Sequence, residues 1–521
     1  MARHLTKSEH CPSTSSTSPT VKSSCSCFQL VRVAWVSTWQ LPMLLSLFSD
    51  AGASAWVQFD DRPSCERHLA GMKMEVEVRV MTLNCWGIVG ISKNRVERMT
   101  AIANYLATSE FDFVFLQEIW SQEDYKRIRK KTKHNLPYGH YFYSGVIGSG
   151  VCVLSKSIIV DAGLLKYNLN GYAHKIFHGD WFGGKVVGLC KVRHRGLNVN
   201  LYVTHLHAEY NRNCDVYLSH RICQSFELSQ YVKHTSESCD LAILAGDFNT
   251  EPLDPPYNII LYNTDLVDTF VDQEKVSRDS MCVGATCGHP DNAYTTSYEK
   301  STCPTGKRID YVMYKVGRGV NIETKSCTTP NLKTPSGIPF SDHEAVEVVM
   351  RVTKSNEWVT SSGLVTPRLG GANGSGAATM SGLSTPERTT GLLDALHRGQ
   401  EQLQQSMDGI HLDRIFYIVA SCFMACILAA TVPLHLPQAY HWILVLSRTV
   451  AAMLLGFCLI MAFFWTSMEK SSLLEARKCM RLLWKAYTLE FDSMMGSTPG
   501  NASPGIMPCE PLLQIQGDQR V

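Results

Sequence analysis

The chain has 521 residues, of which 45% are hydrophobic and 18% carry a charged side chain, so it can bury a sizeable core and is not a disordered chain. Its formal net charge of +2 excludes a general electrostatic attraction for nucleic acid or acidic membranes. The 19 cysteines are scattered without a regular framework, which favours reduced thiols in a cytosolic chain over a small disulfide-bonded secreted scaffold.

Residues 1–71 are predicted to be a low-complexity N-terminal extension with little order. They open with a Ser/Thr-rich run and contain the apolar patch "LPMLLSLF" followed by "SDAGASA", which is similar to a signal-peptide core and its cleavage site. The patch lies about 40 residues into the chain, which is late for a signal peptide, so we favour a poorly structured extension.

Residues 72–353 are predicted to form an α/β domain. "EVEVRV" alternates charged and apolar residues, as a half-buried strand does, and "NRVERMTAIANYLA" places Val96, Met99, Ala103 and Leu106 on one helical face. Further strand-like runs are "FDFVFLQE", "GVCVL", "VVGLCKV", "LNVNLYVTHL", "LAILAGD", "RIDYVMY" and "EAVEVVMRV", with helical stretches such as "VYLSHRICQSFELSQYV" between some of them. This mixture predicts an α/β fold, with two sheets plausible because so many strands must be covered.

Residues 354–410 are predicted to be a flexible linker, because the stretch is rich in Ser, Gly, Thr and Pro ("TSSGLVTPRLGGANGSGAATMSG"). Residues 411–470 then contain two apolar segments, 415–436 and 449–468, each long enough to cross a bilayer core of about 30 Å. The short connection "PQAYHW" makes them a two-helix transmembrane hairpin, in preference to a pair of buried soluble helices. A C-terminal tail of residues 471–521 follows.

Basic residues flank the two ends of this hairpin. Arg398 and Arg414 precede the first segment, five Lys or Arg residues between positions 470 and 485 follow the second, and the connection has none before Arg448, which can snorkel. The positive-inside rule therefore predicts a multi-pass membrane protein whose α/β domain and tail are cytosolic. The membrane would be an internal one, such as the endoplasmic reticulum, or the plasma membrane.

Polar residues lie at the ends of several predicted strands. Taken singly, each of them is more often a turn, a cap or a surface group than a catalytic residue. Their repetition is informative because sites in α/β sheets assemble beyond the carboxyl ends of the strands. An amide and a carboxylate suit a hard cation such as Mg²⁺, while histidines and further carboxylates supply acid and base. The residues are Asn84, Glu118, His205, Asp247, Asn249, Asp310, Asp342 and His343.

The ordered set "NCWG", "LQEIW", "THLHAEYN", "GDFN", "RIDYV" and "SDHEA" resembles the metal-dependent phosphodiesterases of the endonuclease/exonuclease/phosphatase superfamily. Their fold is a four-layer α/β sandwich like that of pancreatic deoxyribonuclease. Within the superfamily, "GDWFGGK", "THLHAEYN" and the hairpin are similar to the membrane-bound, Mg²⁺-dependent neutral sphingomyelinases. The resemblance covers about residues 76–352 and the hairpin. It implies phospholipase C-type hydrolysis of sphingomyelin to ceramide and phosphocholine at a membrane surface, in sphingolipid metabolism and ceramide signalling.

The resemblance also implies a role for each matching residue around the ion and the attacking water. Glu118 matches the principal metal ligand of the family, with Asn84 next to the ion and the phosphate. His343 matches the general base that takes a proton from water, and Asp310 the carboxylate that orients this histidine. Asp342 assists the metal.

Three further residues match the groups that act on the phosphate. Asp247 and Asn249 resemble the pair that positions the nucleophile and hydrogen-bonds the phosphoryl oxygens. His205 is placed to stabilise the transition state or to protonate the leaving alkoxide, whereas His207 in the same motif is open to a purely structural role.

The loop "GDWFGGK" almost fits a nucleotide-binding phosphate loop, but Val186 stands where a metal-binding Ser or Thr is needed and a strand follows instead of a helix. We therefore reject nucleotide binding. The resemblance implies that Asp180 and Lys185 contribute to substrate binding or catalysis, and a Gly-rich turn is the alternative. Trp181 and Phe182 could reach the lipid interface.

Several alternatives stay open from the sequence. Lyso-type choline phospholipids offer the same phosphocholine group as sphingomyelin, and the same fold could act on nucleic acid or phosphoinositides. The domain lacks an excess of Lys and Arg, which argues against nucleic acid as the substrate. It has "KRIDYV" where phosphoinositide phosphatases are expected to have a tryptophan–cysteine–aspartate signature. The full set of acids, amides and histidines argues against an inactive membrane scaffold. A zinc site of Cys282, Cys287, His289 and Cys303 is disfavoured by its irregular spacing. The oligomeric state is not predicted.

Overall fold

The structure, a computed structural model, describes residues 73–172, 174–175, 178–273, 284–355 and 386–495. The whole of the predicted N-terminal extension lies outside the described residues. So do residues 356–385 of the predicted linker and the end of the C-terminal tail.

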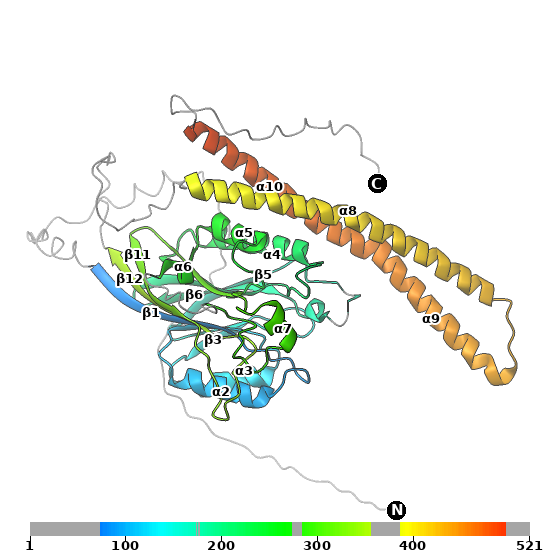
Figure 1. The fold of residues 1–521 in the computed structure, drawn as a ribbon, viewed down its shortest axis with the longest axis horizontal. Coiled ribbons are helices and arrows are strands. Elements are labelled where there is room, and N and C mark those ends of the chain that lie inside the picture. The colour runs from blue at the N-terminus through cyan, green and yellow to red at the C-terminus, as the bar shows by residue number, and fades with distance from the viewer. Residues whose placement is uncertain (1–72, 173, 176–177, 274–283, 356–385, 496–521) are drawn as a thin grey trace, which may run out of the picture. The chain divides into compact units, whose positions relative to one another are not determined.

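Two six-stranded sheets form the centre of the α/β domain (Figure 1). The first has the order β11 (Val320–Thr328), β12 (Val346–Ser355), β1 (Lys73–Asn84), β2 (Phe113–Gln117), β4 (Cys152–Ser155), β3 (Tyr138–Tyr141). The second has the order β5 (Ile159–Lys166), β6 (Val186–His194), β7 (Leu197–His205), β8 (Leu241–Asp247), β10 (Asp310–Val316), β9 (Val267–Asp268). Every strand-like run of the sequence is a strand here, whereas β3, β5, β9 and β11 were not predicted.

The alternation of apolar residues in β1 explains how the first sheet is covered on both faces. Val78 and Val80 point into the core between the two sheets, where they pack with residues such as Ile243 of β8. Met81 and Leu83 belong to a second cluster on the outer face of the same sheet. Burying an aliphatic side chain of this size contributes roughly 1.5–3 kcal/mol, so the two faces together hold the sheet in place.

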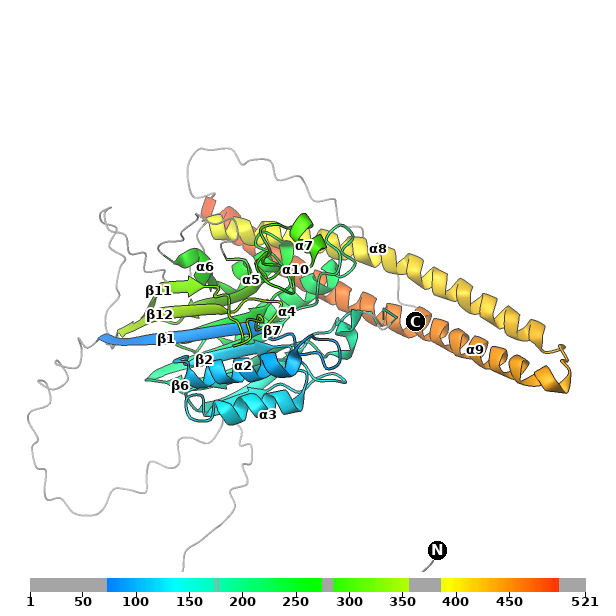
Figure 2. The same cartoon turned by 60° about the horizontal axis from the view of Figure 1, so that its bottom comes forward.

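Helices cover the outer face of each sheet and complete four layers (Figure 2). α2 (Arg95–Thr108) and α3 (Gln122–Lys131) pack on the first sheet, and α4 (Leu218–Thr235) and α5 (Pro255–Thr264) on the second. The short helices α6 (Thr269–Asp272) and α7 (Ser297–Thr302) lie in connections. The four-layer α/β sandwich expected from the motifs is confirmed.

One position of the predicted α2 face was wrong. Met99, Ala103 and Leu106 are buried, but Val96 is 55% exposed. The buried position in the first turn is taken instead by Arg98, whose guanidinium donates hydrogen bonds to four backbone carbonyls. An arginine can occupy this core position because its donors are satisfied there.

The C-terminal helices begin earlier than predicted. α8 (Pro386–Thr431) already includes residues 386–410, which the composition had assigned to the linker. Its Leu392, Leu396 and Leu403 recur at helical spacing and pack against α4 and α5, so this segment is held by an apolar face. α10 (Thr466–Met495) likewise extends through much of the predicted tail and contributes Leu473 to the same cluster.

The remaining parts of these helices form a hairpin with exposed apolar side chains. α8 ends at Thr431, before the predicted end at residue 436, because Pro433 cannot continue a helix. A short 3₁₀ turn, η3 (Gln438–Tyr440), leads into α9 (His441–Ile460), and a π-helical turn, η4 (Met461–Trp465), joins α9 to α10. Arg448 hydrogen-bonds the Thr431 carbonyl and so caps α8.

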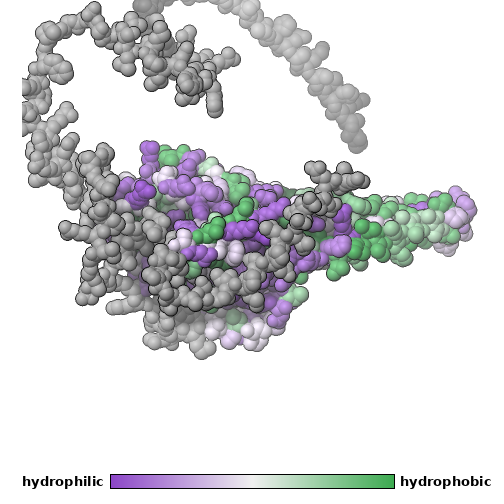
Figure 3. All heavy atoms as spheres, turned by 90° about the horizontal axis from the view of Figure 1, so that it is seen from above, coloured by the Kyte–Doolittle hydropathy of each residue, from purple (hydrophilic) through white to green (hydrophobic). Residues whose placement is uncertain are grey.

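Length and composition would allow both helical stretches of this hairpin to cross a membrane. Hydrophobic residues gather along the hairpin in Figure 3, where polar residues dominate the visible surface of the α/β domain. Among the cysteines that the structure describes, all are free thiols.

Candidate active site

The end of β8 brings three of the predicted residues together at one edge of the second sheet. Asp247, the last residue of β8, is directly opposite His205 of the parallel strand β7 and Asp310 of the antiparallel strand β10. His205 Nε2 lies 3.4 Å from Asp247 Oδ2. His343 Nδ1 lies 2.8 Å from Asp310 Oδ2, so the predicted histidine–carboxylate pair is formed.

Asn84 connects this edge to the other sheet. Its Nδ2 donates to Glu118 Oε1 at 3.0 Å and to Asp247 Oδ2 at 2.9 Å. Asn84 ends β1 and Glu118 directly follows β2, so both come from the first sheet, whereas Asp247 comes from the second. The strand ends of the two sheets therefore come together at one place, as predicted, and we call this place the cleft.

The backbone is unusual where the strands enter this cleft. Trp86, Glu118 and Asn249, three non-glycine residues that follow strand ends, have φ values of 45°, 57° and 46°. Such left-handed conformations are uncommon outside glycine and cluster at functional sites. The first residue of "GDFN" must be glycine for a steric reason, because a Cβ on Gly246 would lie 2.0 Å from the Thr204 carbonyl oxygen.

The cleft carries buried oxygens that lack hydrogen-bond partners among the described residues. They are Glu118 Oε2 and Asp310 Oδ1. One ligand atom each from Asp247, Asp310 and His343 also lies within 4.8 Å of the other two. Because a buried anionic oxygen without a partner is costly, this donor set fits a divalent cation with a preference for oxygen ligands.

The pKa values in the cleft reflect this crowding of carboxylates. Burial and the neighbouring Asp342 raise the pKa of Glu118, and burial together with Asp310 raises the pKa of Asp247 to about 7. A nearby cation would favour the charged forms of these groups. Asp342 also accepts a hydrogen bond from the Ser341 hydroxyl.

The pKa values of the two histidines are shifted in opposite directions. Burial alone would lower the pKa of His343, but Cys287 and Asp310 outweigh it and raise this pKa well above the usual value. Burial and the ammonium group of Lys185 hold the pKa of His205 well below its usual value. The surroundings of His205 therefore disfavour its charged form, whereas Cys287 and Asp310 favour the imidazolium form of His343.

Lys185 lies beneath the cleft and does not face solvent. Its side chain is 0% exposed, and Nζ lies 3.0 Å from Asp180 Oδ1. Nζ also donates to the Leu206 carbonyl, which accepts a second hydrogen bond from Asn249 Nδ2. Asp180 in turn accepts hydrogen bonds from the backbone N–H of residue 208 and from the Tyr210 hydroxyl. The pair ties the "GDWFGGK" loop to the segment after β7.

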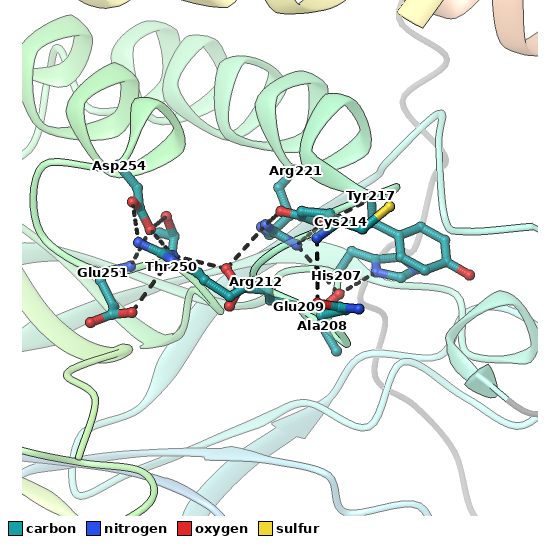
Figure 4. Close-up of polar contacts among 12 residues, drawn as sticks. His207, Ala208, Glu209, Arg212, Cys214, Tyr217, Arg221, Thr250, Glu251 and Asp254 are labelled. Atoms are coloured by element: carbon teal, nitrogen blue, oxygen red, sulfur yellow. Dashed lines mark hydrogen bonds and ion pairs between the residues drawn. The ribbon is translucent and has the colours of Figure 1, made fainter. Parts of the chain in front are cut away.

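A network of ion pairs holds the rest of that segment (Figure 4). Glu209 accepts from Arg212 at 2.9 Å and from Lys307 at 3.1 Å, and Arg221 lies 3.7 Å away. Arg212 also makes two 2.9 Å hydrogen bonds to Asp254, which follows "GDFN". The network therefore joins two motif-bearing loops that are distant in the sequence. The individual charges were visible in the sequence, but their pairing was not.

Sequence reasoning also missed two supporting residues in the loop before α7. Cys287 forms an isolated backbone bridge with His343, and the Thr286 hydroxyl accepts hydrogen bonds from the backbone N–H groups of Ile309 and Asp310. Nothing in the composition of this loop marks these contacts. Of the disfavoured zinc ligands, Cys282 lies outside the described residues, and no metal-ligand group that includes the other three occurs among the residues that the structure describes.

A sandwich of two sheets with carboxylates, an amide and histidines at converging strand ends defines a class of hydrolases. The chain belongs to the Endonuclease/Exonuclease/phosphatase family, whose sequence profile matches residues 81–343. This confirms the superfamily that the motifs indicated.

Named relatives of the chain act on sphingolipids. It is 34% identical over 444 residues to the "Putative neutral sphingomyelinase" of Drosophila melanogaster, a match that covers 78% of this chain and 97% of that protein. It is 42% identical over 284 residues to "Sphingomyelin phosphodiesterase 2" of Homo sapiens, covering 54% of this chain and 66% of that protein. It is 33% identical over 294 residues to "Inositol phosphosphingolipids phospholipase C" of Schizosaccharomyces pombe, covering 53% and 69%.

Proposed function

We propose that this chain hydrolyses sphingomyelin in the manner of a phospholipase C and releases ceramide and phosphocholine. The similarity to the Drosophila protein over nearly its whole length supports this substrate class. The observation that carries the proposal is Asn84, which hydrogen-bonds both Glu118 and Asp247 and so places the acid, base and amide groups of two sheets around one cleft.

The cofactor that we propose is Mg²⁺, held by Glu118 with Asn84 beside it. The partnerless Glu118 oxygen and the raised pKa of its carboxyl group support a cation at this place. Asp342, whose charge contributes to that raised pKa, is proposed to assist the metal. When bound, such an ion offsets the negative charge of a phosphodiester and promotes formation of the nucleophile.

We propose His343 as the general base. Its Nδ1–H donates to Asp310, which leaves Nε2 to accept a proton from the attacking water, and Asp310 stabilises the imidazolium that results. Asp247 and Asn249 are proposed to position this water and the phosphoryl oxygens. His205, whose pKa is lowered and whose Nε2 lies close to Asp247, is proposed to stabilise the transition state or to protonate the leaving alkoxide.

For Asp180 and Lys185 we propose substrate placement through the loop that they fix. The complete burial of Lys185 argues for an indirect contribution in this conformation, because its ammonium group is occupied by Asp180 and the Leu206 carbonyl. Trp181, which is 37% exposed in the same loop, is the side chain that could contact lipid.

We further propose that residues 72–353 are the catalytic domain and that the hairpin crosses an internal, endoplasmic-reticulum-like membrane or the plasma membrane twice. The exposed apolar faces of α8 and α9 support the span. The basic residues at both ends of the hairpin support a cytosolic catalytic domain. The partner of the protein is then the lipid bilayer itself, and choline lysophospholipids are possible second substrates.

The test is headgroup release by the purified full-length chain from a panel of labelled substrates, with and without Mg²⁺. The panel contains sphingomyelin, lysophosphatidylcholine, an inositol phosphosphingolipid, a phosphoinositide and DNA. We expect Mg²⁺-dependent phosphocholine release from sphingomyelin, its loss in His343→Ala, and no change in His234→Ala, a control on the exposed face of α4. A normal rate of phosphocholine release in His343→Ala would contradict the assignment of His343 as the base. Cleavage of DNA alone would contradict the assignment of sphingomyelin as the substrate.

A further inference from the structure

The connection between β3 and β4 carries exposed apolar side chains at its tip. Val146 is 78% exposed and Ile147 is 50% exposed, and Tyr143 just before them is 66% exposed. No residue from 142 to 151 carries a charged side chain. Adjacent apolar residues on an uncharged loop indicate an interaction site rather than an ordinary polar turn. We call residues 143–148 the tip loop.

The tip loop is held in place by the "GDWFGGK" loop. The backbone N–H of Val146 donates to the Phe182 carbonyl at 3.1 Å, and Gly145 forms an isolated backbone bridge with Gly183. A Cβ on Gly145 would lie 2.2 Å from the backbone nitrogen of Gly184, so this close approach requires glycine. The two loops therefore behave as one unit, and the exposed side chains of the tip loop have a fixed position on it.

The same unit contacts the hairpin. The ring centroid of Trp181 lies 6.4 Å from that of Trp465, which belongs to η4 near the end of the apolar stretch. Tryptophan side chains favour the interface between lipid and water, so Trp465 marks the depth of that interface if the hairpin crosses a bilayer. Phe182, which holds the tip loop, directly follows Trp181 in the chain. The tip loop is therefore attached beside the interface.

The tip loop also leads into the cleft. The backbone N–H of Ile119, the residue after Glu118, donates to the Gly150 carbonyl at 2.9 Å. A Cβ on Gly150 would lie 3.0 Å from the Trp120 ring, so the end of this connection packs directly on that ring. Gly183 of the "GDWFGGK" loop approaches the same ring, at 2.8 Å by the same measure. A surface that holds the tip loop would therefore also fix the orientation of the cleft.

We propose that the tip loop is a second membrane contact of the catalytic domain, with Val146 and Ile147 inserted among the lipids of the bilayer that the hairpin crosses. The inference goes beyond the proposed catalytic activity and rests on the proposed membrane crossing. Because the tip loop has no charged side chain, its contact is apolar and requires no acidic lipid. The hairpin already keeps the loop near the surface, so the insertion orients the cleft and is not needed to recruit the protein.

The experiment uses the full-length chain in phosphatidylcholine vesicles that contain no sphingomyelin. The photo-crosslinker p-benzoylphenylalanine, which reacts with nearby C–H bonds on illumination, replaces Val146, and mass spectrometry measures the fraction of this peptide that carries a lipid. We expect a phosphatidylcholine adduct. If the Tm of this variant shows that it does not fold, the same replacement of Ile147 provides the test.

Two matched positions serve as controls. Leu446 on α9 is 55% exposed and should give a lipid adduct, because it lies in the hairpin. Val160 on β5 is 52% exposed but lies at the end of that strand away from the cleft, since its neighbour Ile159 pairs with Val192. It should give only background.

The proposal is overturned if Leu446 yields an adduct while the tip loop yields no more than Val160, or if the tip loop crosslinks to a second protein chain in place of lipid. Loss of the adduct at Leu446 as well would contradict the membrane crossing and with it the tip-loop contact. The readout involves no turnover, so a failure of sphingomyelin hydrolysis would leave this result unaffected, and the reverse also holds.

Discussion

Breaking the ion pair between Asp180 and Lys185 is a change whose cost can be worked out from the structure. Lys185 Nζ lies 3.0 Å from Asp180 Oδ1, and the side chains are 0% and 12% exposed. In Lys185→Met the carboxylate keeps its sheltered position without its cation, which costs about 3–5 kcal/mol. Since 1 kcal/mol corresponds to roughly 2–4 °C for a domain of this size, we expect Tm to fall by about 10 °C.

The loss of Tm in Lys185→Met should depend on pH, and the pKa of Asp180 determines whether this loss grows or shrinks as the pH falls. Burial alone would raise the pKa of Asp180, but Lys185 outweighs it and lowers this pKa. A lowered carboxyl pKa stabilises the fold above the unfolded-state pKa of about 3.9, and the stabilisation is lost as the pH falls through the folded-state pKa. In Lys185→Met, burial instead raises the pKa, so the variant gains stability as the pH falls toward about 4. The Tm difference between wild type and variant should therefore shrink between about pH 7 and about pH 4.5.

Lys191→Met is the matched control for this prediction. Lys191 Nζ lies 3.1 Å from Asp161 Oδ2, but these side chains are 44% and 60% exposed, and surface pairs contribute only about 0–1 kcal/mol. Thermal unfolding of the full-length chain in detergent compares the two variants. Adding Asp180→Asn to Lys185→Met should recover part of the loss, because it removes the unpaired charge. Equal Tm losses in the two lysine variants, or a loss that does not change with pH, would refute the reasoning.

Three further predictions concern the cleft and its attachment to α10. Gly246→Ala should abolish folding, because the new Cβ would lie 2.0 Å from a backbone oxygen of β7, and the yield of folded protein checks this. Glu469→Ala should speed hydrogen exchange around Tyr172, whose hydroxyl loses its acceptor, whereas Glu475→Ala on the exposed side of α10 should not. Glu118→Gln should remove most of the rise in Tm that Mg²⁺ gives the wild type, yet leave Tm without Mg²⁺ equal or higher, because a neutral amide replaces a buried carboxylate whose pKa is raised.

The convergence of the strand ends could be predicted because it depends on two features that are local in the sequence: an apolar run and the polar residue that ends it. Asn84, Glu118 and Asp247 each close an apolar run, and such a run that ends in a polar residue indicates a buried strand leading into a site. Asp310 begins its strand instead, which fits the same cleft because β10 runs antiparallel to β8. The chemical roles of these residues remain predictions.

Contacts between distant segments could not be predicted in this way. The glycines around Lys185 indicate a turn, but the burial of its ammonium group depends on the Leu206 carbonyl, which another strand supplies. The place of Cys287 beside His343 depends on a loop whose composition is unremarkable. The start of α8 was missed for a different reason: the composition of residues 354–385 was extended over a following segment whose leucines recur at helical spacing.

The loop that carries Asp180 is attached to the hairpin helices at two points, which links the packing of these helices to the cleft. The Tyr172 hydroxyl donates to Glu469 of α10, and the ring centroid of Trp181 lies 6.4 Å from that of Trp465, near the end of the apolar stretch. Asp180 lies between these two attachments and holds Lys185 under the cleft. A change in how the hairpin packs on the domain would therefore reach the cleft through this loop. An enzyme whose substrate is a membrane lipid gains from this arrangement, because the same contacts that fix the cleft also hold it next to the end of the apolar stretch.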